Sequence, residues 1–110
     1  MSRMSGYRLM WMMVMFDLPV GTHEERKAAH DFRMQLLDEG FAMAQFSVYL
    51  RYCTGQAFAD ALTQRVVAGL PDGGKVDILV FTDKQYEKMQ TFEQGRRREA
   101  RKNPEQFALL

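Results

Sequence analysis

The sequence predicts a small α+β domain in which an antiparallel sheet carries helices on one face. Along its 110 residues, apolar or β-branched runs typical of strands alternate with segments whose apolar residues recur at helical spacing. Their order is strand, helix, a strand or strand pair, helix, strand. Right-handed crossovers applied to this order give the β-α-β-β-α-β ferredoxin-like arrangement. We expect this domain over residues 1–92 and a basic extension over residues 93–110.

The first strand is expected over residues 7–16, where nearly every side chain is apolar. An uninterrupted apolar run of this kind is typical of a strand that is buried on both faces. The helices cover one face, and we expect no other segment of the chain to cover the second. A second copy of the chain is the simplest way to cover this face, so a homodimer is predicted.

A helix is predicted over residues 22–39. Thr22 and Glu25 have the spacing of a capping box at its start, and Gly40 fits its end. The apolar face is expected to contain the residues that recur at helical spacing, which are Ala29, Phe32, Leu36 and Leu37.

Aromatic and β-branched residues predict a strand over residues 41–52, which we expect to bend into two near residues 45–47. A second helix is expected after Gly55. Its apolar face should contain four residues, which are Phe58, Ala61, Leu62 and Val66. After a turn signal, residues 75–82 alternate as a strand does, and a short helix capped by Thr82 and Gln85 follows.

The composition argues against several classes of protein. A hydrophobic content of 46% with 26% charged residues is ordinary for a globular protein and untypical of disorder. The apolar run of residues 9–16 is far shorter than the about 20 residues that cross a bilayer, and no secretory cleavage site follows it. Cys53 is the one cysteine, so no intramolecular disulfide forms. We expect a cytoplasmic protein with no membrane association.

The charge distribution is more informative than the net charge, which is only +1. A basic cluster near the C-terminus stands against a single acid, Glu99; its members are Arg96, Arg97, Arg98, Arg101 and Lys102. Such a cluster can bind nucleic-acid phosphates and release their counterions. A solvated basic stretch near a terminus explains it equally well.

Asp17 is the sharpest candidate for chemistry, because its carboxylate directly follows the most apolar strand. A turn-forming role before Pro19 is the plain alternative. One carboxylate provides few ligands for Mg²⁺, which usually takes at least one or two carboxylates together with water and substrate phosphate. In a homodimer, however, Asp17 of both copies could share a divalent ion that activates water at a phosphodiester.

Several motifs, in one order along residues 7–92, resemble a known family. They are Met13-Val-Met-Phe-Asp-Leu-Pro19, Arg26-Lys27, Gly40-Phe41, Gln45-Phe-Ser-Val-Tyr49 and Phe81-Thr-Asp-Lys-Gln85. This ordered set resembles the small CRISPR-associated adaptation protein, the one numbered two in its series. Residues 104–110 look like the C-terminal strand of the type II branch of that family.

The resemblance implies a ferredoxin-like homodimer in which Asp17 of each chain binds Mg²⁺ and is the catalytic residue of an endonuclease acting on RNA or duplex DNA. It also implies a scaffold for spacer acquisition, in which the dimer bridges two dimers of the CRISPR integrase subunit and holds a prespacer duplex. Residues 104–110 are then expected to add a strand to the partner's sheet. A toxin-type endoribonuclease of the VapD kind, with the same fold and a strand-end acid, is the alternative.

Individual positions carry parts of this resemblance. Arg26 matches a basic position on the first helix and, with Lys27 and the C-terminal arginines, is expected to bind nucleic acid. Tyr49 matches an aromatic position. The chain departs from the pattern at Met43, where many relatives are basic, and at Phe16, where Tyr commonly precedes the aspartate. These departures concern nuclease activity more than the fold.

Overall fold

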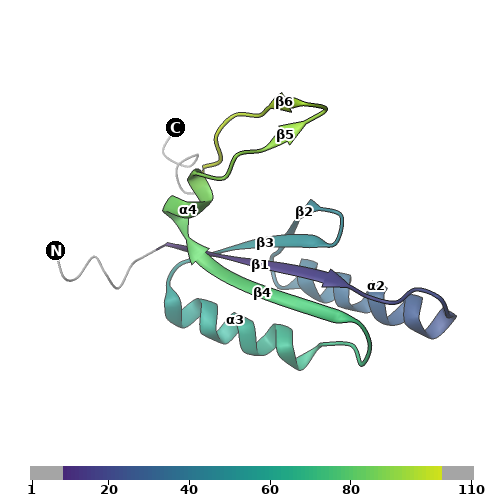
Figure 1. Ribbon diagram of the computed structural model, residues 1–110. Coiled ribbons are helices and arrows are strands. Elements are labelled where there is room, and N and C mark those ends of the chain that lie inside the picture. Colours follow the sequence, from purple (N-terminus) through teal and green to yellow (C-terminus); the bar gives the residue numbers. More distant parts are fainter. Residues whose placement is uncertain (1–8, 103–110) are drawn as a thin grey trace.

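The computed structural model describes residues 9–102 and contains a four-stranded antiparallel sheet with two helices on one face (Figure 1). The sheet order is β2-β3-β1-β4, and its strands are β1 Met10–Asp17, β2 Ala42–Gln45, β3 Val48–Cys53 and β4 Lys75–Thr82. The helices that cover it are α2 His23–Asp38 and α3 Gln56–Ala68. The ferredoxin-like arrangement predicted from the sequence is confirmed. The strand predicted near residues 104–110 lies outside the described residues, as do the first residues of the predicted first strand.

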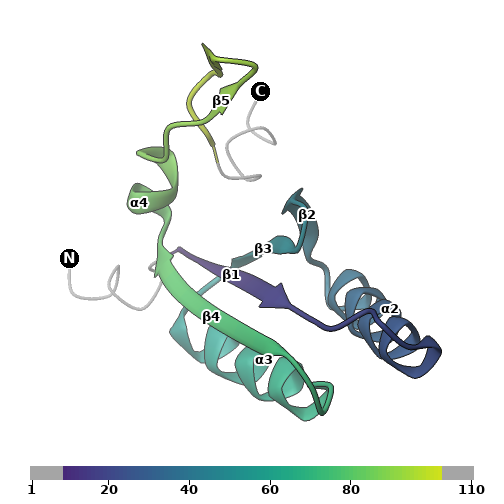
Figure 2. The same cartoon turned by 45° about the vertical axis from the view of Figure 1, so that its right-hand side comes forward.

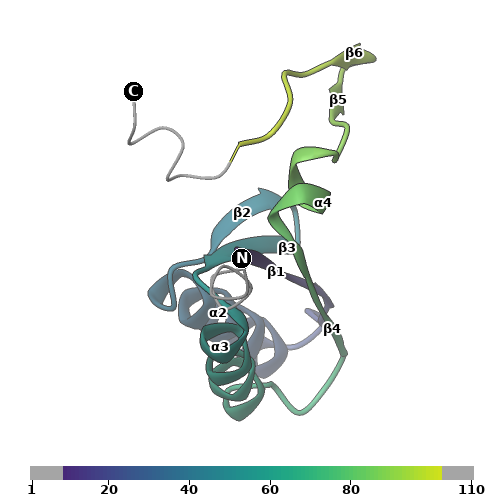
Figure 3. The same ribbon diagram turned by 90° about the vertical axis from the view of Figure 1, so that its left-hand side faces the viewer.

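After β4, a short helix α4 Asp83–Glu87 leads into a small hairpin, made of β5 Phe92–Glu93 and β6 Arg96–Arg97. Figure 2 shows that this hairpin stands apart from the four-stranded sheet, and Figure 3 shows it on the side away from α2 and α3. No helix within residues 9–102 is long and apolar enough to cross a membrane.

Helices α2 and α4 begin where their capping residues predict. The Thr22 hydroxyl accepts from the backbone N–H of Glu25 at 3.1 Å, and the Glu25 carboxylate accepts from the N–H of Thr22 at 3.0 Å. Thr82 and Gln85 form the same reciprocal pair at α4. Each pair satisfies two backbone donors that a helix start would otherwise leave open, which is why both starts were predictable.

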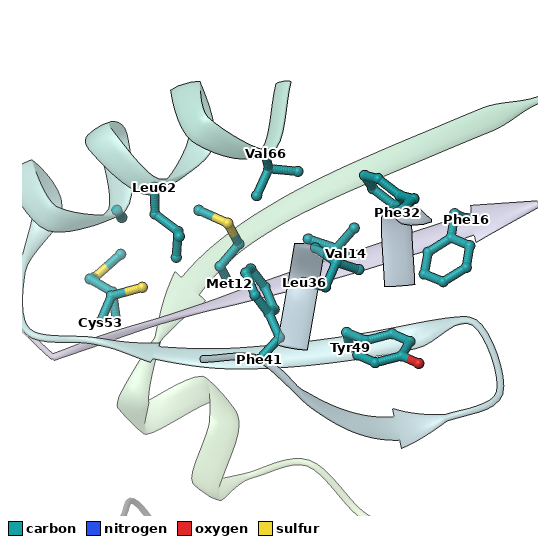
Figure 4. Packing of buried hydrophobic residues seen from close by; sticks show 12 residues of the cluster. Met12, Val14, Phe16, Phe32, Leu36, Phe41, Tyr49, Cys53, Leu62 and Val66 are labelled. Carbon is teal, nitrogen blue, oxygen red and sulfur yellow. The ribbon is translucent and has the colours of Figure 1, made fainter. Parts of the chain in front are cut away.

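The main core lies between the sheet and the two helices (Figure 4). Its fully buried side chains come from every layer, and the largest are Phe32, Met12, Leu36, Leu62, Val14, Val66 and Cys53. Two expectations for the helix faces are wrong. Leu37 is exposed, and on α3 it is Ala59 that is buried in place of Ala61. Residues 59, 62 and 66 follow the helical period, whereas residue 61 is turned about 100° from its neighbour 62.

The second face of the sheet differs from the expectation that no segment is left to cover it. The ring of Tyr86 in α4 stacks on Trp11 with 3.8 Å between ring centroids, and the indole N–H of Trp11 donates to Asp83 Oδ1 at 2.8 Å. Trp11 is therefore only 6% exposed. The cover ends there, because Leu79 further along the same face is 49% exposed. We call this second face, opposite α2 and α3, the open face.

Candidate nuclease site

Asp17 occupies the last position of β1 and is exposed to solvent. From Met12 onward the burial pattern of β1 alternates, with Met12, Val14 and Phe16 in the helix-covered core, so Asp17 belongs to the open face. Its Cα partner in β4 is Lys75. Residues directly opposed in an antiparallel pair point to the same face with Cβ atoms about 4.5–5.5 Å apart. The structure therefore places Lys75 directly opposite the candidate carboxylate, on the same face of the sheet.

A second carboxylate lies on the same part of the open face. Asp77 follows Lys75 by two residues in β4 and forms an ion pair with it, with Nζ and Oδ2 3.7 Å apart. Asp77 is opposed to Met15, so it is a diagonal neighbour of Asp17, within about 7–8 Å between Cβ atoms. Asp77 is absent from the site residues that the sequence predicts. The alternation of β4 was visible, but its register against β1 was not.

The position of Asp17 is fixed through Phe16, the buried residue that precedes it in β1. The Phe16 ring packs edge-on against Phe32 at 5.3 Å and lies 5.7 Å from the ring of Tyr49. The Phe16 N–H donates to the carbonyl of Ser47 at 3.1 Å. Tyr49, the aromatic position of the resemblance, is thus a core residue that supports the strand end from the helix side (Figure 4).

Gly74, in the turn before β4, lies very close to the backbone of Asp17. It has φ +83°, and a Cβ placed there would come within 2.6 Å of the Asp17 carbonyl oxygen and 2.8 Å of the Leu18 side chain. A residue with a side chain would be strained in this conformation and would push the strand end away. Glycine at this turn therefore sets how closely β4 approaches the candidate site.

The donor set of the site suits a hard cation. Carboxylate oxygens are the ligands that Mg²⁺ prefers, and it commonly takes one or two of them together with water and phosphate. Asp17 and Asp77 are both exposed and on one face. Over residues 9–102, no group of three or more His, Cys, Asp or Glu side chains could hold a metal ion.

Arg26 and Lys27 lie near the start of α2, which follows the turn after Asp17 (Figure 1). The Arg26 guanidinium donates to the carbonyl of Val20 at 3.2 Å. Lys27 pairs with Asp31 at 2.9 Å, and this hydrogen bond raises the pKa of Lys27 and lowers that of Asp31. Both basic side chains are exposed at the Asp17 end of the molecule, although each already has a contact within the chain.

The C-terminal arginines lie at the other end of the sheet. Met10, the first residue of β1, is opposed to Thr82, from which α4 leads to Arg96 and Arg97. A strand of this length separates that end from Asp17 by roughly 23 Å. Two further arginines have contacts within the chain: Arg98 pairs with Glu93 at 2.9 Å, and Arg101 lies over the Tyr86 ring at 5.4 Å. A single chain therefore does not bring these arginines to the candidate carboxylate.

Comparison with known proteins agrees with this fold and motif order. The family model described as CRISPR associated protein Cas2 matches residues 10–89. A protein named CRISPR-associated endoribonuclease Cas2 from Paracidovorax avenae is 60% identical over 107 residues, covering 97% of this chain and 99% of that protein. Proteins of the same name from Flavobacterium psychrophilum and Ligilactobacillus salivarius are 45% and 41% identical, over 83% and 92% of this chain and 79% and 100% of their own lengths. The chain belongs to the CRISPR-associated Cas2 family.

Proposed function

We propose that this protein acts in CRISPR spacer acquisition as a homodimer that cleaves phosphodiester bonds at Asp17. The observation that carries the proposal is the exposed Asp17 carboxylate, at the end of a buried strand and on the open face, with Lys75 opposite it. The relatives bear the name endoribonuclease, so RNA is the first substrate to test. Membership of the Cas2 family favours this role over that of a VapD-like toxin.

Pairing of two copies through the open face would complete the site. Beyond the cover of α4, this face retains the half-buried Met13 and Met15 and the exposed Leu79. Exposed apolar area of this kind is a common feature of protein interfaces. A two-fold axis near the Asp17 end would then bring the two Asp17 carboxylates together.

Each residue has a distinct role in the proposed reaction. Asp17, with Asp77 as the second carboxylate, would hold Mg²⁺, and the bound ion supplies an activated water and neutralises charge on the phosphate. The Lys75 ammonium, on the same face, would bind a non-bridging phosphate oxygen and stabilise the charge that develops in the transition state. Asp77 holds this ammonium, since the two form an ion pair.

We propose as well that the dimer is the scaffold between integrase dimers and binds the prespacer duplex. Arg26 and Lys27, exposed at the Asp17 end, are suited to contact phosphates there, and the hairpin arginines would provide a second contact region. These contacts are independent of catalysis, so scaffold and nuclease functions can be tested apart.

The test replaces Asp17 with Asn, which keeps the shape and removes the charge. We expect cleavage of single-stranded RNA with Mg²⁺ to fall by at least about 100-fold, as for loss of a principal catalytic group, while spacer integration with the cognate integrase is retained. Asp38→Asn is the matched control, because Asp38 is an exposed carboxylate at the end of α2 and away from the site.

Lys75→Gln and Asp77→Asn extend the test, with smaller losses expected than for Asp17→Asn. Cleavage that survives Asp17→Asn would remove the nuclease assignment from this site. A protein that remains monomeric at micromolar concentration in sedimentation analysis would contradict the pairing on which the site depends.

A further inference from the structure

The small hairpin of β5 and β6 has two different faces. Its strands pair Phe92 with Arg97 and Glu93 with Arg96, and residues opposed in a hairpin share a face. One face therefore presents Phe92 and Arg97, and the other presents Glu93 and Arg96. We call the first of these the Phe92–Arg97 face.

Although a two-stranded hairpin is marginally stable by itself, this one is tied to the domain. Gln94 and Gly95 at its tip both have positive φ, 53° and 77°, which suits the two-residue turn favoured in hairpins. The Arg98 N–H donates to the Thr91 carbonyl at 2.7 Å, and the Arg101 guanidinium donates to the Thr91 hydroxyl at 3.2 Å. The hairpin is thus held at its base while its tip projects (Figure 3).

These contacts divide the arginine cluster by role. Arg98 pairs with Glu93 and so stabilises the hairpin internally, whereas Arg101 lies over the Tyr86 ring while it donates to Thr91 and so secures the base of the hairpin to α4. Arg96 and Arg97, in contrast, are exposed, and within residues 9–102 neither side chain forms a hydrogen bond or ion pair; Arg97 is the one that shares a face with Phe92. A basic run that looks uniform in the sequence therefore contains two arginines with structural contacts and two that are available to a ligand, one on each face of the hairpin.

Phe92 beside Arg97 is the unusual part of this surface. Its side chain is 57% exposed, although burial would be favourable for a phenyl ring of this size. The surroundings are charged: residues 92–102 contain five basic and two acidic side chains. A single aromatic ring in basic surroundings is suited to a ligand that offers flat rings and negative charge together, whereas a protein partner usually meets a broader apolar patch.

We propose that the Phe92–Arg97 face binds single-stranded nucleic acid, with an unpaired base stacked on Phe92 and a neighbouring phosphate bound by Arg97. Stacking on an exposed aromatic side chain combined with a cationic contact to the backbone is the general mode of single-strand binding. In the interior of a duplex the bases are already stacked and paired, so a lone ring finds no base face to contact there. The inference rests on the proposed function only in taking nucleic acid as the ligand.

The first test measures binding of labelled oligothymidylate and oligouridylate to the full chain without Mg²⁺, and in the Asp17→Asn background. Phe92→Leu keeps an apolar side chain but removes the aromatic ring, and we expect about 5- to 150-fold weaker single-strand binding, since stacking contributes about 1–3 kcal/mol per base. Phe92→Tyr should retain binding. Affinity for a blunt duplex should stay within a factor of two in both variants.

The second test compares the two faces of the hairpin. Arg97→Ala should weaken single-strand binding and reduce the slope of log affinity against log salt by about 0.7, as for loss of one phosphate contact. Arg96→Ala is the matched control, because it removes the same charge from the opposite face of the same strand. Equal losses from the two variants would mean general electrostatic attraction, and would overturn the assignment of this face.

A spectroscopic measurement completes the design. Phe92→Trp places an indole at the proposed stacking position, while the native Trp11 is buried against Tyr86 and supplies a constant background. Quenching on titration with oligothymidylate, absent with blunt duplex, is the expected result. If Phe92→Leu leaves single-strand affinity unchanged but weakens dimerisation or integrase binding, the face is a protein interface and the proposal is wrong. Loss of cleavage with retained Phe92-dependent binding would affect only the nuclease assignment.

Discussion

The two faces of the central sheet use the same strand differently. On the helix-covered face, Met12 and Val14 of β1 are completely buried beneath α2 and α3. On the open face, Trp11 is covered by α4, Met13 and Met15 are half-buried, and Asp17 is exposed. The apolar sequence of β1 thus indicates that both faces of the sheet need a cover. The chain covers the helix side completely, but on the open face it leaves the end with Asp17 accessible. This difference places the candidate site where a second copy or a nucleic acid can reach it.

The largest expected effect comes from the adjacent methionines, which differ chiefly in the face that they occupy. Met12→Ala should lower the free energy of unfolding by about 2–5 kcal/mol, because it leaves a cavity in a closed core. Met13→Ala should cost about 1 kcal/mol in the monomer, since its side chain is only partly buried. Urea unfolding measures both.

Repeating the unfolding at several protein concentrations sharpens this comparison. If the open face pairs with a second copy, the additional loss in Met13→Ala will depend on protein concentration and that in Met12→Ala will not. Equal, concentration-independent losses would contradict the proposed difference between the faces.

An intermediate effect on stability is expected at the turn before β4, where Gly74 lies against the backbone of Asp17. Gly74→Ala should destabilise by about 3 kcal/mol, because it adds backbone strain and pushes a Cβ against the Asp17 carbonyl. Gly95→Ala is the control, with a similar positive φ but nothing within 4 Å of the added Cβ, and should cost about 1–2 kcal/mol. Thermal unfolding compares them, and similar losses would show that crowding at Asp17 is unimportant.

The smallest effect uses Cys53 as a pH probe of the helix-covered face. Burial raises the pKa of its thiol, with nearby Arg51 acting in the opposite direction. The folded state therefore favours the protonated thiol: its contribution is complete below the unfolded-state pKa, about 8.5, and is lost as pH rises towards the folded-state pKa. The expected slope is at most about 1.4 kcal/mol per pH unit.

Cys53→Ala should remove this alkaline slope while leaving the slopes from other groups. Urea unfolding between pH 7 and pH 10 provides the measurement. A variant whose stability follows the same pH dependence as the native chain would mean that the thiol is hydrated in the folded state.

The strongest sequence predictions concern local chemistry. The capping boxes at Thr22 and Thr82 and the bend near residues 45–47 each depend on a few neighbouring residues, and all three are present in the structure. The helix faces were predicted less well, since Ala59 and Ala61 differ only in their angle to the sheet. Asp17 could be singled out as a candidate from the strand that precedes it, whereas its neighbours on the open face could not.

The sequence by itself determined the order of the elements, the capped starts of α2 and α4, and the need for β1 to be covered on both faces. These features depend on hydrophobic periodicity, on secondary-structure propensity and on local hydrogen bonds. Only the tertiary structure decided that Lys75 and Asp77 lie beside Asp17, that α4 covers Trp11, and which face of the hairpin Phe92 and Arg97 share. These facts depend on strand register and on how a segment folds back over the sheet. Such contacts join residues far apart in the chain, so no local pattern specifies them.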